Sequence, residues 1–147
     1  EYDVCAFDEA GKLYVGRWLA KDLLEAGVHS AVSFGPALVI DGVRQTQETF
    51  DGYGYAQHDD NPRAAILQFG PLTYGLVVVN GRTDHSIGVT MDELASIVTD
   101  LGAVQAYNLD GGNSATLAFN GQVFSLKPQD DRGVSDIIYF CSAISEE

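Results

Sequence analysis

The stretch Tyr107-Asn108-Leu109-Asp110-Gly111-Gly112-Asn113-Ser114 is the most informative segment of the chain. A short apolar run ends there in an acid, two glycines, an amide and a hydroxyl. Paired glycines let the backbone turn sharply and approach a ligand closely, because they lack Cβ. Successive N–H groups in such a turn can bind an anion. Asp110 could serve there as base, nucleophile or metal ligand, or it could only cap the bend.

A strand–helix–strand unit leads into this segment. Leu76–Val79 is continuously apolar, as expected of a buried strand. Thr90–Leu101 is amphipathic, and Thr90 with Glu93 forms a capping box at its start. Ala106–Leu109 then follows as the second strand.

The turns after these two strands are expected to meet. If the strands are parallel, the crossover brings both of their carboxyl ends to one edge of the sheet, where ligands bind in open α/β sheets. Asn80-Gly81-Arg82 follows the first strand and Asp110 follows the second. We therefore expect Arg82 and Asp110 to project into a common crevice. The alternative is a surface ion pair between them, which would contribute little.

The whole pattern predicts an α+β fold in a single domain of residues 1–147. The expected architecture is a mixed β-sheet with one strand–helix–strand crossover, several hairpins and two main helices. Asp41-Gly42 and Asn120-Gly121 are each expected to form a tight turn, with Asp41 serving only its own turn. Further strands are expected at 2–7, 12–16, 37–40, 63–69, 73–79, 115–119, 122–125 and 135–142, a second helix at 18–26, and a polar surface loop at 45–61.

Composition narrows the classes of function. The chain has 147 residues, 46% apolar and 20% charged, which is a globular composition with enough length for a real core. The net charge of −13 argues against nucleic acid and anionic lipid as partners. It leaves room for a phosphate-bearing substrate held by local arginines. Cys5 and Cys141 could be free thiols or one disulfide, and no spacing predicts a metal site or a cofactor.

Several segments of the chain resemble segments of the phosphodiester glycosidase family, and they occur in the same order as in that family. The matching segments cover most of the chain after residue 27 and are Ser33–Gly42, Pro62–Ile66, Val79–Arg82, Gly88–Leu101, Asn108–Ser114 and Arg132–Val134. The resemblance implies hydrolysis of a sugar-1-phosphodiester at the anomeric carbon, on a phosphodiester-linked glycan or cell-envelope polysaccharide. One eukaryotic member removes an N-acetylglucosamine that covers mannose 6-phosphate, and secreted or envelope bacterial members are linked with exopolysaccharide. The resemblance thus implies a secreted or cell-envelope location.

The chain also departs from the family pattern. Asn80 stands where Asp is more usual, and Ala64 where Thr is usual. Family members carry further chain ahead of this region, including an element that helps to build the site, and residues 1–27 do not match it. We therefore expect the carboxyl part of the domain, with a missing amino-terminal half as partner. Such a chain should fold well and be a poor catalyst alone.

The resemblance and the turn chemistry together assign expected roles. Asp110 is the base or nucleophile, and Arg82 with Arg63 holds the phosphate in bidentate bonds. Backbone donors and polar side chains would complete the site. The alternative for each side-chain amide is a hydrogen bond to the backbone of its own turn. These further substrate-binding residues are Asn108, Gly111, Gly112, Asn113, Ser114 and Arg132, of which Arg132 could instead be a solvated loop charge.

Two other functions stay open at this point. One is a metal-dependent phosphodiesterase that attacks phosphorus, with Asp110 and another carboxylate such as Asp130-Asp131 on the metal. The other is a non-catalytic glycan-binding module. Tyr53 and Tyr55 could stack on a sugar or complete the core, and His58 and His85 are expected to be exposed loop residues.

Overall fold

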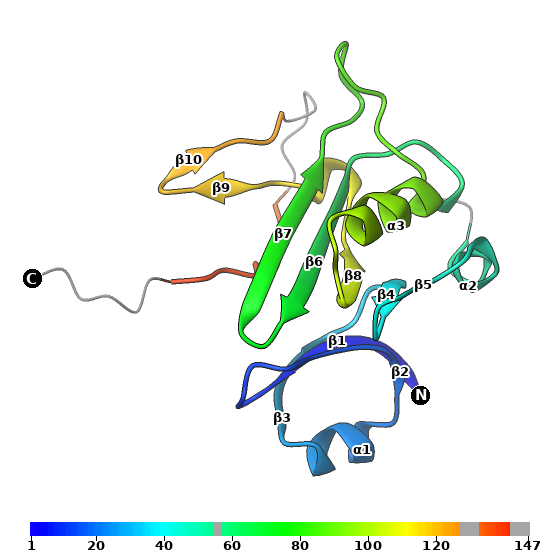
Figure 1. Ribbon diagram of the computed structural model, residues 1–147. Helices are drawn as coiled ribbons and strands as arrows, with labels where there is room; N and C mark the ends of the chain where they lie inside the picture. Colours follow the sequence, from blue (N-terminus) through cyan, green and yellow to red (C-terminus); the bar gives the residue numbers. More distant parts are fainter. Residues whose placement is uncertain (55–56, 127–132, 142–147) are drawn as a thin grey trace, which may run out of the picture.

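The computed structural model describes residues 1–54, 57–126 and 133–141, arranged as Figure 1 shows. Within these residues the strands form a five-stranded sheet, a three-stranded sheet and a two-stranded hairpin. The five-stranded sheet has the order β5-β4-β8-β6-β7. Its members are β4 (Ala37–Ile40), β5 (Val43–Arg44), β6 (Arg63–Gly70), β7 (Thr73–Val79) and β8 (Gln105–Leu109).

Strand β6 lies between β7 and β8 and fixes the direction of both. It is antiparallel to β7, with Arg63 opposite Val79, and antiparallel to β8, with Ala64 opposite Leu109. Two strands that are antiparallel to the same neighbour run parallel to each other. Neighbouring strands in the described residues pair antiparallel. The two strands that the crossover joins, β7 and β8, are parallel to each other but are separated by β6. The predicted α+β class and the shared edge are confirmed.

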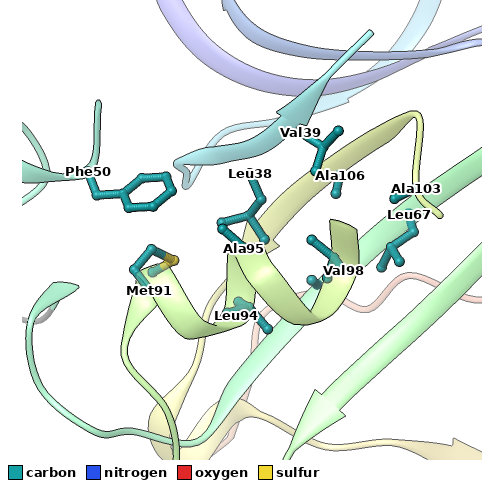
Figure 2. Close-up of a cluster of buried hydrophobic side chains, with 11 residues drawn as sticks. Leu38, Val39, Phe50, Leu67, Met91, Leu94, Ala95, Val98, Ala103 and Ala106 are labelled. Carbon is teal, nitrogen blue, oxygen red and sulfur yellow. The ribbon is translucent and has the colours of Figure 1, made fainter. Parts of the chain in front are cut away.

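Helix α3 (Met91–Asp100) joins β7 to β8 and covers one face of the sheet, as Figure 2 shows. The predicted capping box is present, because Thr90 Oγ1 accepts from the Glu93 N–H at 3.2 Å and Glu93 Oε2 accepts from the Thr90 N–H at 2.8 Å. Burial of a large apolar side chain stabilises a fold by about 1.5–3 kcal/mol, so this core holds the crossover in place. Its buried members are Leu38, Val39, Phe50, Ala65, Leu67, Met91, Leu94, Ala95, Val98, Ala103 and Ala106.

The small sheet packs beside β4 and β8 through a second core. It has the order β2-β1-β3 and consists of β1 (Tyr2–Asp8), β2 (Leu13–Trp18) and β3 (Val28–Val32), with helix α1 (Ala20–Glu25) between β2 and β3. Cys5 and Leu13 are buried against Ile66 and Tyr107. Burial raises the pKa of the Cys5 thiol to about 12. Cys141 is exposed and both cysteines are free, so no disulfide joins them.

Two tight turns follow the prediction. Asp41 and Gly42 both have left-handed backbone angles, φ 50° and 77°, and join β4 to β5. Asn120 and Gly121 have φ 48° and 74° and join β9 (Ala118–Phe119) to β10 (Gln122–Val123). The strands of this second hairpin are shorter than predicted, since they pair over two residues each.

The structure corrects three predicted elements. The second helix spans Ala20–Glu25, because Trp18 still pairs with Tyr2 at the end of β2. The predicted polar loop contains helix α2 (Gln47–Asp51), whose Phe50 is fully buried. Residues 135–141 are not a strand.

Strand β3 was not predicted. Its residues are mostly exposed, so they lack the apolar alternation that marks a half-buried strand.

Candidate functional site

Three segments meet at the edge of the sheet where β7 and β8 end. Asn61–Arg63 leads into β6, Asn80–Arg82 follows β7, and Asp110–Ser114 follows β8 and contains a 3₁₀ turn. We call these segments the turn cluster. Backbone contacts between the segments show that they are packed together.

Glycines make this close packing possible. A Cβ at Gly111 would lie 2.6 Å from the Pro62 carbonyl oxygen, and one at Gly81 would lie 2.7 Å from the Pro62 nitrogen. A Cβ at Gly88 would lie 2.3 Å from the Asn61 carbonyl carbon. Since the obstructing atoms belong to the backbone, any side chain at these positions would push the segments apart. The group that approaches these glycines is protein backbone, and the close approach of a ligand to the turn stays a prediction.

Arg82 is the central cation of the turn cluster. Its backbone has φ 55°, a conformation that bulky residues rarely adopt and that often marks a functional constraint. Its Nη1 donates to Asn113 Oδ1 at 3.1 Å, and its Nη2 donates to Asn61 Oδ1 at 2.6 Å. A guanidinium has five N–H donors, so within the described residues three of them remain for a ligand.

The charge of Arg82 is not neutralised by an ion pair in the described part of the chain. The ion pairs found there join Lys21 with Asp22, Arg44 with Asp92, and His58 with Asp51. Asp110 is exposed at the start of the turn and forms no such pair with Arg82. The alternative of an Arg82–Asp110 surface ion pair is therefore not what the structure has.

The two glycines of the turn differ in what they offer. The Gly112 N–H donates to the Pro62 carbonyl at 2.8 Å, so this donor is engaged within the protein. Its lack of a side chain lets Arg82 approach, since a Cβ there would lie 3.3 Å from Arg82 Nη1. The Gly111 N–H has no acceptor in the described residues. Gly111 thus remains the candidate backbone donor, and a donor role for Gly112 would require the Pro62 bond to open.

Asn108 lies in β8, and Ser114 is the last residue of the 3₁₀ turn. Asn108 is 2% exposed, and its Nδ2 donates to the Gly35 carbonyl at 2.7 Å. In the described residues, Asn108 Oδ1 and Ser114 Oγ are buried without a hydrogen-bond partner, which is costly for polar atoms. Asn108 joins β8 to the segment before β4 in this structure, and the expected contacts of both side chains with substrate stay predictions.

Arg63 has the contacts of a residue that fastens loops. It is 5% exposed, its Nε donates to the Val89 carbonyl at 3.1 Å, and its Nη2 donates to the Asp59 carbonyl at 2.9 Å. Burial lowers its pKa, the carboxylate of Asp59 opposes that change, and the nearby charge of Arg82 adds to it. Arg63 therefore places a second positive charge near Arg82, and its direct contact with a phosphate stays a prediction.

Some predicted residues lie outside the described part of the chain. These are Arg132, Asp130, Asp131 and Tyr55. Within the described part, no group of three His, Cys, Asp or Glu side chains is arranged to hold a metal ion.

Sequence reasoning missed Asn61. Its contact with Arg82 spans 21 positions of the chain and depends on β6 lying beside β7. One signal in the sequence could have pointed to Asn61. Pro62 restricts the backbone of the residue before it, and it directly precedes the predicted strand at 63–69.

A separate cavity of about 410 Å³ lies against β1, β2, β4 and α2. Asp3, Arg17, Glu48 and Tyr53 contribute to its wall. The Tyr53 hydroxyl donates to Asp3, and burial raises the pKa of Asp3. Tyr53 is thus engaged with β1 at the wall of this cavity, and stacking of its ring on a sugar stays a prediction. His58 and His85 are exposed, as predicted.

The turn cluster sets the guanidinium of Arg82 beside the glycine-rich turn that follows β8. The phosphodiester glycosidase family model matches residues 1–141, and the chain therefore belongs to the phosphodiester glycosidase family. The match begins at residue 1. The match thus includes residues 1–27, which lie ahead of the segments that carry the resemblance in the sequence.

The chain is also similar to individual proteins and solved structures. The chain is 30% identical over 141 residues to the SPbeta prophage-derived uncharacterized protein YomE of Bacillus subtilis, covering 92% of this chain and 21% of YomE. It resembles the catalytic domain of zebrafish N-acetylglucosamine-1-phosphodiester alpha-N-acetylglucosaminidase, auto-inhibited by its pro-peptide, with a TM-score of 0.69 and 26% identity, over 86% of this chain and 45% of that one. A hypothetical protein from Synechocystis matches with a TM-score of 0.62 and 31% identity, over 74% of this chain and 20% of that one.

The chain is much shorter than these relatives. It spans about a fifth of YomE and of the Synechocystis protein, and under half of the zebrafish catalytic domain.

Proposed function

We propose that this chain hydrolyses a sugar-1-phosphodiester at the anomeric carbon. The observation that carries the proposal is the guanidinium of Arg82, which is bonded to two neutral amide oxygens beside the turn that holds Asp110. In a chain of net charge −13, such a cation is suited to one local anion. Membership of the phosphodiester glycosidase family supplies the class of reaction.

The proposed reaction breaks the bond between C1 of the sugar and the bridging phosphate oxygen. The transition state resembles an oxocarbenium ion, and glycosidases usually serve it with two carboxyl groups. The leaving group here is a phosphate monoester, so neutralising its charge matters more than protonating it. The three remaining N–H donors of Arg82 serve this purpose through charge-assisted hydrogen bonds.

Asp110 acts on the sugar side of that bond. As a base it takes a proton from the water whose oxygen forms the new bond to C1. As a nucleophile it bonds to C1 first, and water then releases the sugar. In both routes the electron pair of the broken bond leaves with the phosphate. The exposed position of Asp110 at the turn gives it access to a ligand.

Hydrolysis in water enriched in ¹⁸O tests the reaction. The substrate is the methyl diester of N-acetylglucosamine 1-phosphate, incubated with and without a chelator. Glycosidase chemistry puts the label on the sugar and survives the chelator. Label in the phosphate, with loss of turnover in the chelator, would instead establish a metal-dependent phosphodiesterase. Binding of the diester without any turnover, by this chain and equally by a form extended at its amino terminus, would point to a glycan-binding module.

A phosphodiester-linked envelope glycan as substrate and a secreted or cell-envelope location belong to the same proposal. They rest on the family resemblance. In the described residues no helix is long and apolar enough to cross a membrane. Fractionation of the source cells tests the location, because the proposal expects the protein outside the cytoplasm.

A further inference from the structure

Asn61 occupies a position in the turn cluster that neither the family assignment nor the sequence motifs explain. Its Oδ1 accepts from Arg82 Nη2 at 2.6 Å, the shorter of the two bonds that hold the guanidinium. The other acceptor, Asn113 Oδ1, comes from the turn after β8. Arg82 is thus held from two sides by two amides that are far apart in sequence.

Asn61 is itself held firmly. Its N–H donates to the Val89 carbonyl at 3.2 Å, and its carbonyl accepts from the Val89 N–H at 3.1 Å. Its Nδ2 donates to the Asp59 carbonyl at 3.3 Å, which directs its Oδ1 towards Arg82. Pro62 restricts its backbone from the other side. A guanidinium bonded to such a residue loses much of its rotational freedom before any ligand arrives, and preorganisation of this kind favours binding.

The chemistry of the acceptor matters as much as its position. An amide oxygen orients a guanidinium and leaves its positive charge available, whereas a carboxylate at the same place would neutralise it. The carboxylates of Asp59 and Asp60 lie near enough to Arg63 to affect its pKa, so acids are present close to this position. The residue that touches Arg82 is nevertheless neutral.

We infer that Asn61 is a positioning residue that holds the Arg82 guanidinium ready for the phosphate of the substrate without neutralising its charge. This inference rests on the proposed function, because it assigns Arg82 to the phosphate. Asn61 acts through Arg82 and need not touch the substrate.

The test replaces Asn61 by its charged near-isostere. Asn61→Asp keeps the size and the acceptor oxygen, so its melting temperature should equal or exceed that of the parent protein. Binding of the methyl diester of N-acetylglucosamine 1-phosphate, measured by calorimetry, should weaken by about tenfold or more, as expected for an altered close charge pair. Asn120→Asp adds the same charge in the exposed turn between β9 and β10 and should change the Kd by less than twofold.

The possible results separate the two proposals. If the parent protein binds the diester and Asn61→Asp binds as Asn120→Asp does, the positioning role is wrong and the proposed function stands. If the parent protein does not bind the diester, the proposed function falls and the inference falls with it. Should Asn61→Asp fail to fold, Asn61→Ala tests the positioning role instead. It removes the oxygen that accepts from Arg82, so it must also weaken binding of the diester. Parent-like binding by a folded Asn61→Ala would overturn the inference.

Discussion

At the scale of single residues, the proposed binding of phosphate depends on the shape of the Arg82 side chain as well as its charge. Its two terminal nitrogens reach Asn61 and Asn113 at the same time. A lysine ammonium is a single point charge and cannot reproduce this fork. The planar group explains why an arginine is placed here even though its left-handed backbone is unfavourable.

Arg82→Lys should therefore weaken substrate binding despite keeping the charge. We expect KM to rise by about tenfold, which corresponds to the loss of one charge-assisted hydrogen bond. Steady-state kinetics measure this, with Arg17→Lys, at an exposed position of β2, as the control. Unchanged kinetics for Arg82→Lys would remove Arg82 from the site.

We predict that Gly111 is required for the stability of the fold, in addition to any role as a hydrogen-bond donor to substrate. A Cβ there meets the Pro62 carbonyl oxygen at 2.6 Å, and neither backbone can yield easily. Gly111→Ala should lower the free energy of unfolding by about 1–3 kcal/mol, the usual cost of overpacking. Urea denaturation measures it, with Gly133→Ala as the matched control because no atom of the described residues lies within 4 Å of a Cβ there. Equal stabilities would show that the turn after β8 is looser than described.

At the scale of elements, local signals were the ones that sequence could predict. The capping box and apolar stripe of α3 involve residues three or four apart, so the helix follows from its own sequence. The tight turns at Asp41-Gly42 and Asn120-Gly121 are local in the same sense. The shared edge of β7 and β8 was inferred correctly from the order of these elements.

Elements and contacts that depend on distant partners were missed. Strand β3 exists because its exposed residues pair with β1, and helix α2 because Phe50 is buried against α3. The apolar segment 135–142 was predicted as a strand, but composition alone does not provide a pairing partner, and its described residues 135–141 are not a strand. For the same reason the sequence indicated Arg82 and the glycines, yet could not show that Asn61 holds Arg82.

The capping box of α3 should have a measurable effect on stability. Thr90→Ala removes the hydroxyl that accepts from Glu93 and should cost about 1 kcal/mol. Thr116→Ala, at an exposed position, is the control. Urea unfolding compares the two variants, and equal free energies would mean that packing alone sets the start of the helix.

At the scale of the whole molecule, the small sheet and the five-stranded sheet share a core. Cys5 and Leu13 from the first pack on Ile66 and Tyr107 from the second. The side chain of Gln68 in β6 also accepts from the Leu13 N–H at 3.0 Å and donates to the Gly11 carbonyl at 2.9 Å. These contacts predict that both sheets unfold together as one domain.

Two probes of unfolding test this prediction. Trp18 is the single tryptophan and lies at the end of β2, so its fluorescence reports on the small sheet. Far-ultraviolet circular dichroism reports on the secondary structure of the whole chain. We expect the two urea transitions to coincide, as for a two-state domain. An earlier transition in the fluorescence would show that the small sheet is a separate unit.

The proposed function assigns the chemistry to Asp110, the acid of the turn cluster. Asp110→Asn is nearly isosteric and lies at an exposed position, so the melting temperature should stay unchanged. Turnover of the methyl diester of N-acetylglucosamine 1-phosphate should fall by about 10²–10⁴-fold, the usual contribution of a catalytic acid or base. Binding of the diester should persist, because Arg82 is intact. Full turnover by Asp110→Asn would contradict the account.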